Sequence, residues 1–298
     1  PDMVSNLCAG KKKACLSVEE IVAETGLQAL SAGDLRMLVD PQAGARIVSF
    51  TRAGVEMLTS AAVHPDNYGS TFWDSPQSAW GWPPRAVLDS EPYTVVASAG
   101  TLELVSHVDP SGLQFSKRIH ANVARGCIEI EYRMVNHAQA PIKIGPWEIT
   151  RVPGGLSFFP YEEVPGLPPT VLEPVSYENG ICWYDFDAAL LAQGRKLFSG
   201  AKEGWLAHVG PERMLFVKTF LDTQPADYAP EQGEVEIWGN DGGNYVELEN
   251  HGQYRELHPG EAYSYRVDWH RVKLPDDIEV RPGNPALVKL ARQVAGVA

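Results

Sequence analysis

The stretch Asn244-Tyr245-Val246-Glu247-Leu248-Glu249-Asn250 indicates the fold more clearly than any other part of the chain. Its residues alternate in a way that is typical of a β-strand. Tyr245, Glu247 and Glu249 share one side of that strand, and Val246 and Leu248 share the other. Two carboxylates on one strand face repel each other. They therefore belong either to a concave site that uses a carboxylate or to a solvated face, where Glu is usually found.

Strand patterns continue on both sides of this segment. The runs Ile128-Glu129-Ile130-Glu131-Tyr132 and Tyr263-Ser264-Tyr265-Arg266-Val267 alternate with a period of two, as half-exposed antiparallel strands do. Gly, Pro, Asn and Asp separate the segments. We predict strands near residues 35–39, 46–50, 93–98, 101–107, 113–120, 127–135, 141–149, 180–184, 204–209, 213–220, 234–238, 244–249 and 263–271.

Helices are predicted only near the two ends. A Ser cap, early acidic residues and a stop at Gly26 predict a short helix over residues 17–24. Asn284-Pro285 opens a second helix near 285–296, with an apolar stripe of Leu287, Leu290 and Val294. Many strands with almost no interleaved helices exclude a parallel α/β fold. We therefore predict an all-β chain, with residues 1–26 as an N-terminal extension and residues 27–298 as a single large antiparallel β-sandwich domain.

Composition limits the function classes. The chain has 298 residues, 44% of them hydrophobic, and a formal net charge of −13. Phosphate recognition needs a surface rich in Lys and Arg, so this acidic balance argues against nucleic-acid binding. No apolar run approaches the roughly 20 residues of a membrane span. The oligomeric state stays open.

The four cysteines are Cys8, Cys15, Cys127 and Cys182, and their spacing matches neither a zinc pattern nor a Cys-x-x-Cys pair. Cys127 and Cys182 lie in apolar runs and are interpreted as buried hydrophobic residues. If Cys8 and Cys15 form a disulfide, a periplasmic or secreted location is favoured. If they are free thiols, a cytoplasmic location is favoured.

A second informative segment, from Tyr68 to Pro84, holds Trp73, Trp80 and Trp82 among several prolines. Such a composition predicts a rigid aromatic loop and not a regular strand. Indole faces stack on the apolar faces of sugar rings, and Asp74 and Gln77 offer hydrogen bonds to hydroxyl groups. The alternative is a loop that plugs one end of the sandwich, since Trp is usually largely buried. The Pro-rich section from Pro160 to Pro174 predicts a long excursion over an end of the sandwich.

Further polar candidates come from two strands. Trp147 and Arg151 alternate with Glu148, so Glu148 and Arg151 point to opposite sides of their strand, and either one is a candidate for a cleft. Lys218 sits between bulky apolar residues. It faces either the solvent or the cleft, where it would bind a carboxylate, phosphate or hydroxyl group.

The histidines are scattered, and neither His-x-His nor His-Glu-x-x-His occurs, so no metal site of those types is expected. His251 follows Glu249 closely and titrates in a useful range, although an exposed turn residue is the alternative. No phosphate loop, dinucleotide fingerprint or Gly-x-Ser-x-Gly elbow is present. We therefore expect no cofactor.

Five short segments of the chain, taken in order, resemble the galactose mutarotase-like superfamily of aldose 1-epimerases and hexose-6-phosphate epimerases, and within it a bacterial branch. The resemblance spans about residues 27 to 274 and rests on their order, because each is short. The pieces are residues 39–50 as an opening hairpin, 54–58 as the "G-x-E-x-L" strand, 72–82 as a sugar-site loop, 246–250 as the "L-E-T-Q" strand and 257–261 as the "L-x-P-G-E" turn.

The resemblance implies a β-supersandwich that binds a carbohydrate and interconverts the anomers of a free sugar or sugar derivative. Glu249 matches the base that removes the proton from the anomeric hydroxyl. The two histidine motifs of the superfamily are missing, so the acid that protonates the ring oxygen is open among Glu148, Lys218 and His251. The alternative is a non-catalytic carbohydrate-binding protein. The substrate contacts implied are Asp74, Gln77, Trp80, Trp82, Trp147, Arg151, Lys218 and Glu247.

Overall fold

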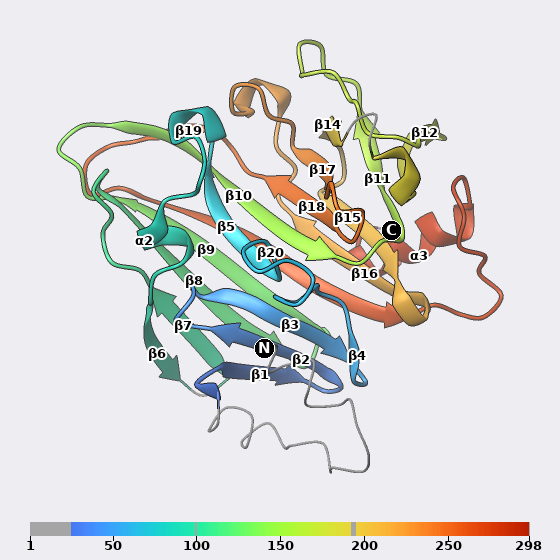
Figure 1. Ribbon diagram of the computed structural model, residues 1–298, viewed down its shortest axis with the longest axis horizontal. Coiled ribbons are helices and arrows are strands. Elements are labelled where there is room, and N and C mark those ends of the chain that lie inside the picture. Colours follow the sequence, from blue (N-terminus) through green and yellow to red (C-terminus); the bar gives the residue numbers. More distant parts are fainter. Residues whose placement is uncertain (1–24, 99, 192–194, 298) are drawn as a thin grey trace.

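The computed structural model describes residues 25–98, 100–191 and 195–297 (Figure 1). The helix predicted over 17–24 and the cysteines at positions 8 and 15 lie outside the described residues. The strands are β1 Gln28–Ala32, β2 Leu35–Asp40, β3 Arg46–Arg52, β4 Val55–Glu56, β5 Ser70–Ser75, β6 Thr94–Ser98, β7 Thr101–Val105, β8 Leu113–Asn122, β9 Cys127–Asn136, β10 Ile142–Val152, β11 Leu156–Glu162, β12 Val175–Glu178, β13 Ile181–Asp185, β14 Lys196–Ala201, β15 Trp205–Gly210, β16 Met214–Phe220, β17 Val235–Gly239, β18 Val246–His251, β19 Arg255–Leu257 and β20 Ala262–Lys273. The helices are α2 Ala86–Asp89, α3 Pro285–Ala295 and the 3-10 turns η2 Gln77–Ala79, η3 Ala188–Leu190, η4 Pro211–Arg213 and η5 Pro225–Asp227.

The strand pairings, all antiparallel, form two long sheets. The first sheet has the order β1-β2-β3-β5-β10-β18-β17-β14, with β4 beside β3. The second has the order β6-β7-β8-β9-β20-β16-β15-β11-β13-β12. The end of β11 also pairs with β14 and joins the sheets at one corner, while β19 pairs with the first residues of β10. The predicted all-β antiparallel class is confirmed, and Figure 1 shows how sparse the helices are.

Aromatic side chains fill the space between the two sheets. Phe50 of β3 contacts Phe216 of β16 and Trp269 of β20, with ring centroids 5.7 and 5.3 Å apart. Phe72 of β5 stacks on Tyr132 of β9 at 4.2 Å. Alternate residues of each strand point into this layer, so one face of the first sheet is buried in the core and its other face is free to form a site.

Helix α3 covers the outer face of the second sheet, where its apolar residues pack with Trp205 and Val217. The side chain of Asn284 caps the helix by accepting a hydrogen bond from the backbone N–H of Ala286 at 2.9 Å. Pro285 occupies the first turn, where its missing N–H costs nothing. Among the described residues, no helix has the length and apolarity needed to cross a membrane.

Two expectations about irregular segments are wrong in part. The aromatic segment 68–84 is not a loop throughout, because Ser70–Ser75 forms β5 inside the first sheet. Its prolines all follow Ser75, so none removes an N–H from this strand. Pro160 likewise belongs to β11, and its carbonyl accepts a hydrogen bond from the N–H of Lys202 at 3.0 Å. The Pro-rich excursion therefore begins only after Glu162.

Candidate functional site

A cavity of about 940 Å³ opens on the free face of the first sheet. Strands β5, β10, β14, β17 and β18 supply its base, and the loop after β5 and the segments near Pro168 and Pro230 supply its edges. Trp82 at the edge is 59% exposed, whereas Glu249 at the base is fully buried. The lining residues are Asn67, Trp73, Pro76, Gln77, Ser78, Gly81, Trp82, Trp147, Pro168, Lys196, Phe198, Pro230, Glu231, Gln232, Glu236, Trp238, Glu247 and Glu249.

Strand alternation explains how the carboxylates reach this cavity. Glu247 and Glu249 share one face of β18 and line the cavity, while Val246 and Leu248 on its other face join the core between the sheets. The antiparallel register places Glu236 of β17 directly opposite Glu249. Glu249 and the aromatic segment of β5 and its loop therefore share one hollow.

Lys196 of β14 binds the two carboxylates of this base. Its Nζ lies 2.7 Å from Glu236 Oε2 and 2.6 Å from Glu249 Oε1. Burial raises the pKa of Glu236 to about 7, against the opposing charge of Lys196, and the neighbouring charge of Glu249 adds to the rise. Burial also lowers the pKa of Lys196, but the two carboxylates outweigh it and raise that pKa above its ordinary value. The lysine therefore stays charged, and one carboxyl group of the pair exchanges a proton near neutral pH.

Trp147 and His251 complete the surroundings of Glu249. The indole Nε1 of Trp147 donates a hydrogen bond to Glu249 Oε2 at 2.8 Å. His251 stacks against the same indole, with ring centroids 5.1 Å apart, and its Nε2 lies 3.5 Å from Glu236 Oε1. Burial lowers the pKa of His251 well below its usual range, and Lys196 and Lys218 add to this effect. His251 is a buried strand residue and not an exposed turn residue.

Arg151 supports the second glutamate of β18 from beneath the cavity. Its Nε donates to Glu247 Oε1 at 2.8 Å, and its Nη1 donates to Thr71 Oγ1 at 3.1 Å. The guanidinium carbon lies 5.4 Å from the ring centroid of Trp73. Burial raises the pKa of Glu247, and Arg151 opposes that rise. Arg151 thus neutralises and fixes Glu247, and its own side chain is fully buried.

Indole rings pack edge to face along one wall. The ring centroids of Trp73 lie 5.9 Å from those of Trp82 and 5.1 Å from those of Trp147. Trp80 contacts Trp73 and donates from Nε1 to the backbone carbonyl of Asp74 at 2.8 Å, but it is not among the lining residues. These contacts hold the wall rigid, since edge-to-face aromatic pairs are favourable.

The remaining predicted residues occupy different places. Gln77 lines the cavity. Asp74 lies behind the wall, where its Oδ1 is 3.5 Å from Arg85 Nε, and where burial raises its pKa while Arg85 opposes the rise. Glu148 and Lys218 are fully buried between the sheets, with Lys218 Nζ 2.8 Å from Glu148 Oε2. The structure therefore does not bring these last two residues to the cavity, and Lys218 faces neither solvent nor cleft.

Several lining residues were missed by the sequence reasoning, among them Lys196, Phe198 and Glu236. A signal for one of them exists, because Glu236 and Trp238 alternate with apolar residues in the predicted strand 234–238. The partner of that strand decides its importance, however, and one sequence does not report strand pairing. Lys196 begins a strand that carries no clear alternation.

Comparison with solved structures supports the fold. The chain is similar to a putative aldose 1-epimerase from Escherichia coli K12, with TM-score 0.57 and 14% identity over 83% of this chain and 99% of that one. It is also similar to a galactose mutarotase-like protein from Lactobacillus casei, with TM-score 0.56 and 11% identity over 83% and 100% of the two chains. A galactose mutarotase related enzyme from Lactobacillus acidophilus gives TM-score 0.58 and 12% identity over 86% and 99%.

The predicted superfamily resemblance is thereby confirmed at the level of fold: the chain has the galactose mutarotase-like β-supersandwich. Sequence identities of 10–15% to these structures support a shared fold and nothing further. No protein-family model and no curated protein sequence matches the chain.

Proposed function

We propose that the cavity binds a neutral sugar and interconverts its anomers by acid and base catalysis, with Glu249 as base and Glu236 as acid. The observation that carries this proposal is the pair of buried carboxyl groups bound by Lys196 at the base of a cavity walled by tryptophans. The proposal agrees with the names of two similar structures, a putative aldose 1-epimerase and a galactose mutarotase-like protein.

The lining suits a pyranose ring. Trp82, which is 59% exposed, offers apolar surface for the C–H face of a sugar, and the largely buried Trp73 and Trp147 line the wall beside it. Gln77 and Asn67 offer amide groups for the hydroxyls of the sugar. Small-molecule sites combine such apolar walls with a few placed polar groups. A volume of about 940 Å³ admits a monosaccharide with room for a second ring.

The two carboxyl groups supply the proton transfers that ring opening needs. Glu249 removes the proton of the anomeric hydroxyl, and Glu236 donates its proton to the ring oxygen as the C1–O5 bond breaks. Rotation of the free aldehyde and the reverse transfers close the ring as the other anomer. One oxygen of each carboxyl group lies within 4.8 Å of the other, which is close enough to reach two oxygens bonded to one carbon. A carboxyl pKa near 7 suits a general acid at neutral pH.

Charge selects neutral sugars over phosphorylated ones. Among the described residues that line the cavity, Glu231, Glu236, Glu247 and Glu249 stand against Lys196 as the one basic side chain. Lys196 is already bound to two carboxylates, and Arg151 below is bound to Glu247. Within the described part of the chain, no lining cation is left to hold a phosphate or a sugar carboxylate, and like charges in a partly buried site repel strongly.

Substitution of Glu249 by Gln tests the proposal. It keeps the shape of the side chain and its contact with Trp147 but removes the base. We expect anomer exchange of glucose or galactose, measured by NMR exchange spectroscopy, to fall by about 10²- to 10⁴-fold. Binding of the sugar, measured by quenching of tryptophan fluorescence, should persist. The matched control is Glu103→Gln, at an exposed position on β7.

Two outcomes separate the candidate functions. If the unsubstituted protein binds the sugar but does not exchange its anomers faster than buffer, the non-catalytic carbohydrate-binding function holds. If neither binding nor exchange is detected for any neutral aldose, the sugar assignment fails as a whole. Glu236 and Glu249 line the cavity, whereas His251 and the pair Glu148–Lys218 are not among its lining residues, and this favours Glu236 as the acid over the other candidates.

A further inference from the structure

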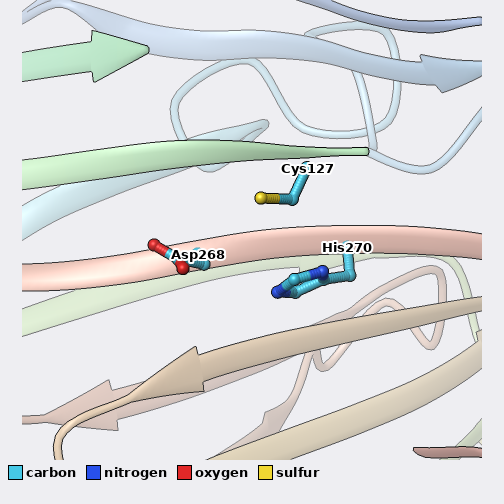
Figure 2. Close-up of side chains that lie close together, drawn as sticks. All are labelled: Cys127, Asp268 and His270. Carbon is cyan, nitrogen blue, oxygen red and sulfur yellow. The ribbon is translucent and has the colours of Figure 1, made fainter. Parts of the chain in front are cut away.

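A second cluster of metal-binding side chains lies on the outer face of the second sheet, apart from the cavity. Cys127 begins β9, and Asp268 and His270 lie on the neighbouring strand β20 (Figure 2). We propose that Cys127, Asp268 and His270 bind one Zn²⁺ ion.

The register of the two strands brings the donors together. His270 is the direct partner of Cys127 in the β9–β20 pairing, and Asp268 lies two residues earlier on the same face of β20. One ligand atom from each residue lies within 4.8 Å of the others. Two donors on one tetrahedral zinc ion lie roughly 3.5 Å apart, so small side-chain rotations close the site. Figure 2 shows the thiol and the imidazole both extending toward the carboxylate.

A buried ring nitrogen without a hydrogen-bond partner marks the site independently of the spacing. His270 is only 6% exposed, and its Nε2 is buried without a hydrogen-bond partner. Buried polar atoms nearly always have a partner, and an exception calls for an explanation such as a bound ion. A metal ion at the centre of the cluster would supply that partner.

Arginines orient the third ligand without blocking it. Asp268 Oδ1 accepts one hydrogen bond, from Arg266 Nε at 2.7 Å, and Oδ2 accepts from Arg266 Nη2 and Arg125 Nη1. Each carboxylate oxygen has two lone pairs, so Oδ1 keeps one for a metal. Hydrogen bonds of this kind commonly fix the ligands of a metal site. Glu129, opposite Asp268, binds the same two guanidinium groups and offsets their charge.

The donor set selects the ion. A thiolate, an imidazole and a carboxylate suit Zn²⁺ and do not suit Mg²⁺ or Ca²⁺, which take oxygen ligands. Three protein ligands leave a fourth position for water or a small ligand. Asp268 and Arg266 also line a surface hollow of about 690 Å³, so the hollow reaches one of the three proposed ligands. Among the described residues, a second cluster has metal-ligand spacing, Glu236, Glu249 and His251, but it already holds the ammonium group of Lys196 between its carboxylates.

Cobalt substitution tests the site in the full chain. Protein dialysed against a chelator is titrated with Co²⁺ alone, and Zn²⁺ is then added. We expect one equivalent of Co²⁺ to bind. The bound ion should show the visible bands of tetrahedral cobalt and a sulfur-to-cobalt charge-transfer band. Both signals should be lost when Zn²⁺ displaces the Co²⁺. Cys127→Ser should abolish the charge-transfer band, and His270→Gln should weaken Co²⁺ binding by more than tenfold. Circular dichroism shows whether each variant is folded.

The other cysteines supply the controls. Cys182→Ser changes a buried thiol elsewhere, and the double variant Cys8→Ser, Cys15→Ser removes the two N-terminal thiols. Both should keep the charge-transfer band. The proposal is overturned if the band survives in folded Cys127→Ser, if it disappears in either control, or if the folded unsubstituted protein binds no Co²⁺ in a saturable way. Should Cys127→Ser not fold, unchanged affinity in His270→Gln overturns it equally.

Discussion

Glu236 and Glu249 face each other on adjacent strands, and the ammonium group of Lys196 touches both. Each carboxylate lies within 2.7 Å of that nitrogen. One cation shared by two buried carboxyl groups leaves one negative charge without a partner, so the pair holds a proton to a higher pH than an exposed glutamate does. The negative charge of Glu249 adds to the effect of burial and raises the pKa of Glu236 further.

The pH dependence of anomer exchange follows from this pair. Burial raises the pKa of Glu236 to about 7. A general acid works only while protonated, so the catalysed rate should be highest below pH 7 and fall about tenfold per pH unit well above it. The measurement is kcat/KM for a neutral aldose from pH 5 to 9, after subtraction of the uncatalysed rate.

Glu236→Gln provides the comparison for this profile. The amide cannot give up a proton, so the rate should drop at every pH and the fall on the alkaline side should vanish. A variant with an unchanged alkaline limb would assign that limb to another group and would remove Glu236 from the role of acid.

Discrimination against phosphorylated sugars is expected from the charges of the lining. A 6-phosphate would enter among Glu231, Glu247 and the Glu236–Glu249 pair with Lys196 already occupied. Like-charge contact costs several kcal/mol, so kcat/KM for glucose 6-phosphate should lie at least about 100-fold below that for glucose. Equal values for the two sugars in the same exchange assay would contradict the charge argument.

Much of the strand pattern could be predicted from the sequence, because half-buried antiparallel strands repeat with a period of two. The alternation in β9 and β20 is of this kind, and β18 alternates in sequence in the same way although all its residues are buried. β5 was missed because its tryptophan lies next to a Pro-rich loop, and β14 was missed because its residues, Lys196 to Ala201, do not alternate. Such strands are held by their partners in the sheet and not by their own propensity.

The residues of the candidate site could be predicted only where the pattern within a single segment identifies them. Glu247 and Glu249 share a face by simple alternation, and the tryptophans stand out by composition. Glu148 shows the limit of that reasoning, since it adjoins Trp147 yet points into the core toward Lys218. Which face of β10 is open depends on the second sheet, and the metal donors of β9 and β20 likewise meet only through strand pairing.

The buried pair Glu148–Lys218 should contribute to stability and not to the chemistry of the cavity. Tyr132 and Trp269 also donate to Glu148, at 2.6 and 3.2 Å, so the pair joins β10 to strands of the second sheet. Lys218→Met removes one charge and leaves a buried carboxylate. We expect it to lower the free energy of unfolding by about 3 to 5 kcal/mol, measured by urea denaturation.

The double variant Glu148→Gln, Lys218→Met is the control for that measurement. It removes both charges and should recover much of the loss, because no unpaired charge remains in the core. Equal destabilisation in the single and double variants would show that packing and not charge sets the cost.

Glu234 provides a separate test of stability against pH. Its side chain is buried and accepts a hydrogen bond from the N–H of Thr223 at 2.5 Å. Burial raises its pKa to about 8, against the opposing effect of the Thr223 bond. The folded protein thus binds this proton more tightly than the unfolded chain, whose glutamate titrates near its ordinary value of 4.5. The stability from this group is complete below pH 4.5 and is lost as the pH rises through 8.

Glu234→Gln should therefore gain stability relative to the unsubstituted protein as the pH rises from 5 to 9, by an amount on the order of a few kcal/mol. Urea denaturation at several pH values gives this difference. Glu129→Gln is the matched control: burial raises the pKa of Glu129, but hydrogen bonds from Asn122 and Arg125 outweigh it and lower the pKa below its usual value. That carboxylate stays ionised from pH 5 to 9, so the difference in free energy of unfolding between Glu129→Gln and the unsubstituted protein should not change with pH. A flat difference for Glu234→Gln as well would mean that Glu234 is charged in the folded protein at neutral pH.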